Sequence, residues 1–213
     1  YVEKPLCYCI REGCKMVEAA RKYQRIVQVG NAEHAHATGD LVMETEKAGR
    51  IRVVYTSLNR LRQSIGKVTS DQPIPPSIDY NLWLGPAPMG PLRRQRLHYD
   101  WHWVWDTGNG DLGNQGIHQM DIARWFLGEN ELAPITMSIG GRLGYVDDGE
   151  TANTQIIYHG YAKAPLIFEV RGLPEKTDSK EMDQYRGASI GVIVQGEHGQ
   201  LVIPSYTGAG AFD

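Results

Sequence analysis

The sequence predicts an α/β unit followed by an α+β region: one strand–helix–strand unit of a doubly wound sheet, then helices and a large, mainly antiparallel open sheet. Two observations carry this prediction. In residues 1–30, apolar residues recur at helical spacing between two short extended segments. Five strand-like runs separated by turn-rich segments then fill the second half of the chain.

The first unit depends on one amphipathic helix. Its apolar residues recur at helical spacing: Ile10, Cys14, Val17 and Ala20. The helix is expected to end near Tyr23. Residues 26–30 then read as a short strand interrupted only by Gln28, the pattern of a parallel strand covered by helices on both sides. The carboxyl ends of such strands are the natural place for a ligand.

The middle of the chain predicts a second helix, a strand and a long excursion. Thr38 or Asp40 can cap a helix that ends at Gly49 in the left-handed conformation, and a strand follows over residues 51–58. Residues 72–92 are rich in proline and glycine and predict an ordered excursion without regular structure. Long loops of this sort often line sites.

A third helix and five strands complete the prediction. The helix begins at Gln115 or Gly116 and ends at Leu127, with Asn114 as its cap and Gly128 as its terminator. The strand-like runs cover residues 134–139, 154–159, 166–171, 188–195 and 200–203.

Composition bounds the class of protein. The 213 residues can bury one core, or one core and part of a second. Hydrophobic residues at 41% and charged residues at 22% are typical of soluble globular chains, and no apolar run approaches the roughly 18 residues of a membrane span. A net charge of −3 argues against a nucleic-acid partner, since the basic cluster at 93–96 is short. We therefore expect neither a membrane nor a nucleic acid as partner.

The cysteines and the chain ends are less informative. Cys7, Cys9 and Cys14 form an odd, closely spaced set, which argues against a disulfide framework and favours buried thiols in a helix over a metal site. The chain begins without Met, and residues 200–204 lead into the glycine-rich stretch 207–210 without a closing element. We expect a fragment, and the compartment, cytoplasmic or periplasmic, stays open.

Glu3-Lys4-Pro5 is the first candidate site. It lies at the carboxyl end of a predicted strand, where the ammonium of Lys4 would point into the crevice. An ammonium there can bridge a cofactor ribose and a substrate hydroxyl, and it stabilises the alkoxide that develops as hydride departs. A surface lysine before a proline is the alternative reading.

Residues 111–121 are the second candidate site, because they lead from a glycine-rich loop into the third helix. His118 falls in the first turn, where its imidazole could take or return a hydroxyl proton. Asp121 lies on nearly the same helical face and could orient the ring. A purely structural histidine is equally compatible with the pattern. A metal site at His118 and Asp121 is disfavoured, because no second histidine falls at a matching position.

Residues 98–106 form the third candidate site, an aromatic segment. If the segment is extended, Tyr99, Trp101, Trp103 and Trp105 share one face and His102 lies on the other. An aromatic face suits a sugar ring, so Tyr99 and His102 are candidate substrate contacts. The rings could equally fill the core. His34 and His36 read as exposed polar residues.

Several of these motifs together resemble the Gfo/Idh/MocA family of oxidoreductases. They occur in order along nearly the whole chain: Glu3-Lys4-Pro5, the amphipathic helix, the strand 26–30, the strand after Gly49, residues 80–88, Gly116 to Asp121 with Trp125 and Gly128, and residues 151–154. The resemblance implies a Rossmann remnant over residues 1–32. It also implies an α+β domain over residues 33–213, whose open sheet forms a homo-oligomer contact and one wall of the site.

The resemblance also implies a chemistry. Lys4 would act with His118 on a sugar or polyol, with NAD or NADP as cofactor. The family usually carries an aspartate four residues before the histidine, where this sequence has Asn114. An amide can hydrogen-bond a hydroxyl but cannot accept its proton, so Asp121 or Asp111 would have to compensate, or the chemistry differs.

The motif that would bind the nucleotide is the main feature of the family that the sequence does not supply. No G-x-G-x-x-G follows a predicted strand, so the cofactor contacts that can be proposed are Glu3, Lys4, Pro5 and Gln28. The leading hypothesis is a fragment of an NAD(P)-dependent sugar or polyol oxidoreductase, inactive by itself. The alternatives are redox-assisted glycoside cleavage with tightly held NAD, and a non-catalytic sugar-binding or assembly module.

Overall fold

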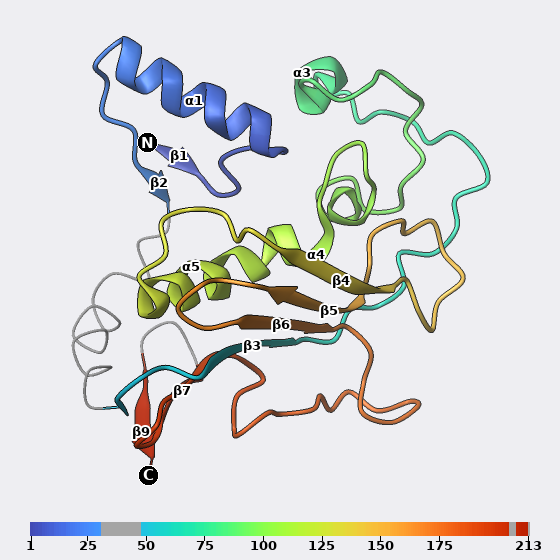
Figure 1. Ribbon diagram of the computed structural model, residues 1–213. Helices are drawn as coiled ribbons and strands as arrows, with labels where there is room; N and C mark the ends of the chain where they lie inside the picture. Colours follow the sequence, from blue (N-terminus) through green and yellow to red (C-terminus); the bar gives the residue numbers. More distant parts are fainter. Residues whose placement is uncertain (31–47, 205–207, 213) are drawn as a thin grey trace.

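The computed structural model describes residues 1–30, 48–204 and 208–212, which form two sheets (Figure 1). Strands β1 (Val2–Glu3) and β2 (Val29–Gly30) pair in parallel, and helix α1 (Ile10–Lys22) connects them. The other sheet has seven strands in the order β4-β5-β6-β3-β7-β8-β9. A parallel β-α-β unit followed by a large open sheet confirms the predicted fold class.

Helix α1 has the predicted limits, but its surroundings differ from the prediction. Glu12 lies in its first turn and basic residues in its last, which suits the helix dipole. No residue of α1 is buried, and Ile26 is 100% exposed. The expectation of a covered strand over residues 26–30 is therefore wrong for the described chain. A two-residue strand pair with one helix cannot cover both of its own faces.

The seven-stranded sheet is antiparallel except where β3 pairs with β6. Its strands are β3 (Val53–Asn59), β4 (Thr136–Gly141), β5 (Thr154–His159), β6 (Leu166–Arg171), β7 (Ile190–Gln195), β8 (Gln200–Ile203) and β9 (Gly210–Phe212). The predicted runs coincide with β5, β6 and β8 and miss the starts of β4 and β7 by two residues. Strand β9 was not expected; it pairs with β8 after the glycine-rich stretch.

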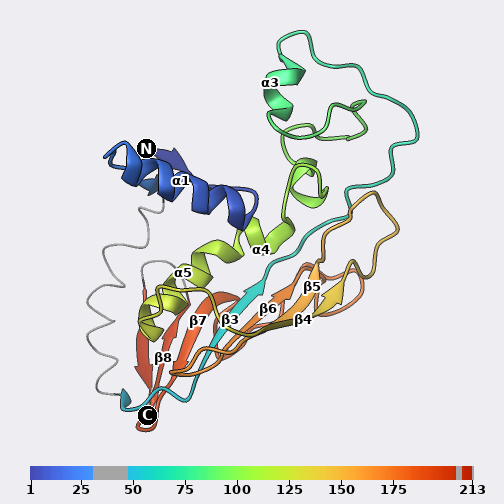
Figure 2. The same cartoon turned by 45° about the horizontal axis from the view of Figure 1, so that its top comes forward.

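Helix α5 (Gly116–Leu127) covers one face of this sheet and packs on β3, β6 and β7 (Figures 1 and 2). The buried core between them includes Val54, Ile122, Phe126, Leu166, Val192 and Val194. Gly128 ends the helix in the left-handed conformation, as predicted. Asn114 does not cap it, because a short helix α4 (Gly110–Asn114) comes first and Gln115 occupies the cap position.

Residues 60–99 leave the sheet and project away from it (Figure 2). They contain helix α3 (Tyr80–Leu84), whose cap residue Asp79 accepts a hydrogen bond from the backbone N–H of Leu82 at 3.0 Å. Apart from this five-residue helix the proline-rich stretch has no regular structure, which confirms an ordered excursion over residues 72–92.

The aromatic segment 98–106 is not extended. It forms a 3-10 helix, η3 (Asp100–Trp103), and the carboxylate of Asp100 accepts the backbone N–H of Arg96 at 2.8 Å. Because the segment is helical, its aromatic side chains do not share one face: Trp103 is 2% exposed, whereas Trp105 is 51% exposed. The condition for a shared aromatic face is therefore not met, and the alternative, that the rings fill the core, holds for Trp103.

Two further expectations are corrected or lie outside the description. Cys9 and Cys14 are exposed and Cys7 is half-buried, so the three are not buried thiols in a helix. Most of the second predicted helix, together with His34 and His36, lies outside the described residues; Gly49, its expected terminator, has the left-handed φ of 71°. In the described part of the chain no helix has the length and apolarity needed to cross a membrane.

Candidate functional site

Lys4 lies against the junction of α4 and α5, although it is 110 residues away in the chain. Its ammonium donates to the backbone carbonyl of Asn114 at 2.7 Å and to the side-chain carbonyl oxygen of the same residue at 3.0 Å. The carboxyl end of β1 and the end of α4 thus meet at one point, which brings the Glu3-Lys4-Pro5 motif beside the segment that leads to His118.

The carboxyl end of β3 brings two arginines to the same junction. Arg60 donates to the side chain of Gln115 at 3.2 Å. Arg62 binds the carboxylate of Asp111 with Nε at 2.8 and 2.7 Å and with Nη2 at 2.5 Å, and the side chains are only 6% and 1% exposed. Asp111 is therefore committed to a buried ion pair, which argues against the idea that it replaces the family's missing aspartate.

The environment of Lys4 disfavours its charged form. Partial burial lowers the pKa of its ammonium, and the positive charge of Arg62 lowers it further. Asn114 contributes oxygens but no negative charge to offset this. Lys4 therefore holds its proton less tightly than an exposed lysine.

Tyr99 and His102 both reach this region. The hydroxyl of Tyr99 accepts from Arg62 at 3.2 Å, and its backbone carbonyl oxygen lies 2.6 Å from Nδ1 of His102. The imidazole stacks on Trp101 with ring centroids 3.8 Å apart. Burial lowers the pKa of His102, and the nearby charges of Arg62 and Lys4 lower it further, although the bond to Tyr99 opposes them. A neutral imidazole is favoured near neutral pH.

The other predicted site residues are placed as follows. Glu3 ends β1 opposite Gly30, and the carbonyl of Gln28 accepts the backbone N–H of Val2 at 2.9 Å. His118 lies half-buried in the first turn of α5, and its backbone N–H donates to Gln115 at 3.2 Å. Asp121 follows on the same helix. Convergence of the His118 imidazole and the Lys4 ammonium on one hydroxyl stays a prediction.

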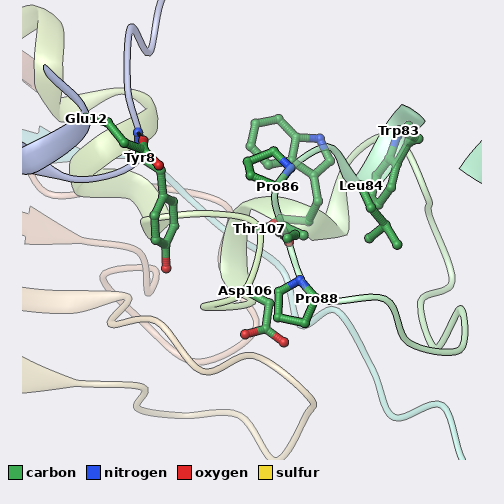
Figure 3. Close-up of a pocket in the computed structure, with 10 residues that line it drawn as sticks. Tyr8, Glu12, Trp83, Leu84, Pro86, Pro88, Asp106 and Thr107 are labelled. Carbon is green, nitrogen blue, oxygen red and sulfur yellow. Dashed lines mark hydrogen bonds between the residues drawn. The ribbon is translucent and has the colours of Figure 1, made fainter. Parts of the chain in front are cut away.

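Two adjoining pockets open beside this junction. The inner pocket, about 250 Å³, is lined by Pro5, His102 and Asn114 among others. The outer pocket, about 560 Å³, lies between the start of α1 and the loop that follows α3 (Figure 3). The two share five lining residues: Tyr8, Glu12, Pro86, Trp101 and Thr107. The inner pocket therefore connects Pro5 and Asn114, which adjoin Lys4, to a larger space.

The letters G-x-G-x-x-G do occur at Gly108 to Gly113, but in the wrong structural setting. They follow η3 and open the five-residue helix α4, whereas a dinucleotide-binding turn follows a strand and opens a long helix. A Cβ on Gly108 would lie 2.5 Å from the carbonyl oxygens of Trp101 and His102. Packing of the loop on η3 thus accounts for the glycine at this position without a phosphate.

Residues 55–177, more than half of the chain, match the family model for the C-terminal alpha/beta domain of the Gfo/Idh/MocA oxidoreductase family. The chain belongs to this family. The resemblance inferred from the motifs is thereby confirmed. A search of curated proteins found no match.

Solved structures of Gfo/Idh/MocA type have the same fold. The chain superposes on the WlbA dehydrogenase of Chromobacterium violaceum in complex with NADH and UDP-GlcNAcA, with a TM-score of 0.65, 18% identity and coverage of 99% of this chain and 50% of that one. For WlbA of Bordetella pertussis, also with NADH and UDP-GlcNAcA, the TM-score is 0.64 and the identity 18%, with coverage of 100% of this chain and 55% of that one. For the aldose-aldose oxidoreductase of Caulobacter crescentus with glycerol, the TM-score is 0.62 and the identity 16%, with coverage of 98% of this chain and 51% of that one. The chain therefore spans about half the length of these structures.

Sequence reasoning missed the two arginines of this Gfo/Idh/MocA chain. Arg60 and Arg62 come directly after strand β3, and residues at the carboxyl ends of strands often belong to sites. That position was the available signal. A metal site has no support within the described residues, where no group of three potential ligands comes together.

Proposed function

We propose that the protein containing this chain is an NAD(P)-dependent oxidoreductase that transfers hydride between a carbon of a sugar or polyol and nicotinamide. The observation that carries the proposal is the contact of Lys4 with Asn114, since it joins the end of a parallel strand to the segment that carries His118. Membership of the oxidoreductase family and the NADH complexes of the WlbA enzymes support it.

Lys4 would stabilise the negative charge that develops on the reacting oxygen. Its ammonium is half-buried, where an electrostatic interaction is stronger than in water. In the free protein the two oxygens of Asn114 hold this ammonium in place. A substrate hydroxyl would add to these partners or replace one of them.

His118 would take the hydroxyl proton during oxidation and return it during reduction. The start of α5 positions the residue, and a histidine titrates in the range that this relay needs. The amide of Asn114 would orient the hydroxyl without competing for its proton. His102 lines the inner pocket, and the hydroxyl of Tyr99 accepts a hydrogen bond from Arg62 of the buried ion pair. Both side chains would therefore contact the rest of the sugar.

The residues present fit the nicotinamide end of a dinucleotide. The carboxyl ends of β1 and β2 lie at one edge, where Glu3 and Lys4 offer an acceptor and a donor for ribose hydroxyls and Pro5 lines the inner pocket. When bound, nicotinamide would accept or supply the hydride. Gln28 would contribute only through its side chain, because its carbonyl is used within the sheet.

The full-length protein tests the proposal. Incubation with NAD or NADP and a panel of sugars and polyols should reduce the cofactor, and Lys4→Ala and His118→Ala should abolish the reduction. Unchanged rates in both variants would remove these residues from the mechanism. The non-catalytic alternative requires sugar binding without any affinity for a nicotinamide nucleotide, which calorimetry measures directly.

Redox-assisted glycoside cleavage is a second candidate. The outer pocket favours it, because a second ring could lie next to the ring held near Asn114. Such an enzyme would release the aglycone without net formation of NADH. Measurement of both products on one glycoside separates cleavage from dehydrogenation.

We also propose that the protein forms a homo-oligomer through the open sheet. Exposed apolar side chains line the face of β4 and β5 that α5 does not cover: Met137, Ile139, Ile156 and Tyr158. Pairing with a second copy would remove this surface from water. Ile139→Glu should lower the mass measured by light scattering on the full-length protein, whereas an unchanged mass would contradict this interface.

A further inference from the structure

The inner and outer pockets together impose a requirement on the ligand. They share Trp101, whose ring is held by stacking on His102 and by a hydrogen bond from its indole N–H to the carbonyl of His98 at 3.2 Å. A ligand that reaches Asn114 through the inner pocket would extend along this tryptophan into the outer pocket. The space is larger than one small ring requires.

The walls of the outer pocket are mainly aromatic and proline side chains. Figure 3 shows Tyr8 and Glu12 on one side and Trp83 and Leu84 on the other, with Pro86 and Pro88 between them. Tyr80 stacks on Trp83 with centroids 5.7 Å apart, which extends the aromatic surface behind this wall. Aromatic and proline walls suit the C–H faces of a sugar ring.

The charged groups of the outer pocket are acidic. Of the described residues that line it, Glu12 and Asp106 are ionisable carboxylates, and none is a lysine, arginine or histidine. Asp106 is exposed, and its carboxylate lies in the lining of the outer pocket (Figure 3). An exposed carboxylate accepts hydrogen bonds from neighbouring sugar hydroxyls, whereas its negative charge disfavours a phosphate beside it.

Of two places where an anion could bind, the start of α1 is already occupied. Glu12 accepts the backbone N–H groups of Tyr8 at 2.8 Å and Cys9 at 3.4 Å, so its own carboxylate fills the start of α1. Arg94 lies over the ring of Trp83, 5.3 Å from its centroid, and burial lowers the pKa of its guanidinium, although Tyr80, Asp100, Asp106 and Glu150 oppose the shift. Its Nη1 is buried without a hydrogen-bond partner among the described residues, so the preference for an uncharged ligand depends on Glu12 and Asp106.

We propose that the substrate is an uncharged glycoside of at least two sugar rings, with one ring in the inner pocket and the next in the outer pocket. This inference rests on the proposed sugar chemistry beside Lys4. It separates this chain from the two WlbA structures, whose ligand UDP-GlcNAcA carries a diphosphate.

Binding to the full-length protein tests the inference independently of turnover. Calorimetry would compare cellobiose, maltose and lactose with glucose, galactose and UDP-glucose. The best disaccharide should bind at least fivefold tighter than its monosaccharides and tighter than UDP-glucose. Tighter binding of UDP-glucose, equal binding of one-ring and two-ring sugars, or no binding of any disaccharide would overturn the inference.

Variants of the outer pocket sharpen the test. Trp83→Ala should weaken disaccharide binding about 3- to 10-fold and change monosaccharide binding less than twofold, the range expected for loss of an aromatic wall. Asp106→Asn, at an exposed position, should weaken the disaccharide and strengthen UDP-glucose. Trp105→Ala and Asp71→Asn are matched controls outside both pockets.

The inference fails if Trp83→Ala and Asp106→Asn bind both sugar classes as the controls do. Reduction of NAD or NADP is measured separately on the same samples. If disaccharides bind as expected but no sugar reduces the cofactor, the pocket assignment stands and the proposed oxidoreductase function does not.

Discussion

The ammonium of Lys4 and the side-chain oxygen of Asn114 lie 3.0 Å apart, across 110 residues of sequence. An aspartate at position 114 would form an ion pair with this lysine. The amide instead leaves the lysine with hydrogen bonds alone, in a partly buried place that Arg62 makes more positive. Burial and the charge of Arg62 therefore lower the pKa of Lys4 without a negative charge beside it to oppose them.

Loss of either Lys4 or His118 should reduce activity strongly. We expect Lys4→Ala and His118→Ala to lower kcat/KM by about 10²- to 10⁴-fold, because each removes a group that interacts with charge or a proton in the transition state. Steady-state kinetics on the full-length protein measures this. Lys15→Ala, an exposed lysine on α1 that pairs with Glu18, should retain full activity.

Asn114→Asp should move the alkaline limb of the pH profile to higher pH. Burial and the charge of Arg62 lower the pKa of Lys4, and a carboxylate at the position of the amide oxygen would raise it. In the wild type the limb should lie below the ordinary titration range of lysine. A limb that does not move in the variant would show that Lys4 does not control it.

The buried ion pair of Arg62 and Asp111 should be important for stability. Asp111→Asn leaves a buried guanidinium without its counter-charge and should cost about 3 to 5 kcal/mol in the free energy of unfolding. Asp71→Asn breaks a pair with Arg93 whose side chains are 61% exposed, and should cost at most about 1 kcal/mol. Urea unfolding of the two variants compares them directly, and equal losses would contradict the expected role of burial.

Asp147 should make stability depend on pH in the acid range. Burial raises the pKa of its carboxyl group, but hydrogen bonds from Arg142 and from the backbone N–H groups of Ile65 and Gly149 outweigh burial and lower it from 3.8 to about 2. The unfolded state then binds the proton more readily, so the stabilisation is complete above pH 3.8 and is lost as the pH falls toward 2.

The size of this effect is roughly 2 kcal/mol, from the shift between the two pKa values. Unfolding of the full-length protein between pH 5 and pH 2 measures it. Asp147→Asn should flatten the pH dependence in this window, whereas the control Asp71→Asn should keep it. An unchanged slope in Asp147→Asn would assign the acid sensitivity to other groups.

Local sequence patterns determined much of this chain. The apolar period of α1, the terminator Gly128 and the strand-like runs of β5, β6 and β8 were readable, because each depends on residues that are near neighbours in the chain. The family followed from the order of several short motifs. Residues 98–106 misled the prediction, since an alternation of aromatic residues is compatible with a strand but does not require one.

The tertiary structure alone decided which of the predicted residues meet. Three relationships depend on the order of the strands and the path of a long irregular segment. Lys4 contacts Asn114, Arg62 forms an ion pair with Asp111, and the start of α1 faces the loop after α3. Contacts across a hundred residues leave no periodic trace in the sequence, because the chain between them can take many paths. The packing of α5 and the loops on the sheet selects one of those paths, and with it the two pockets.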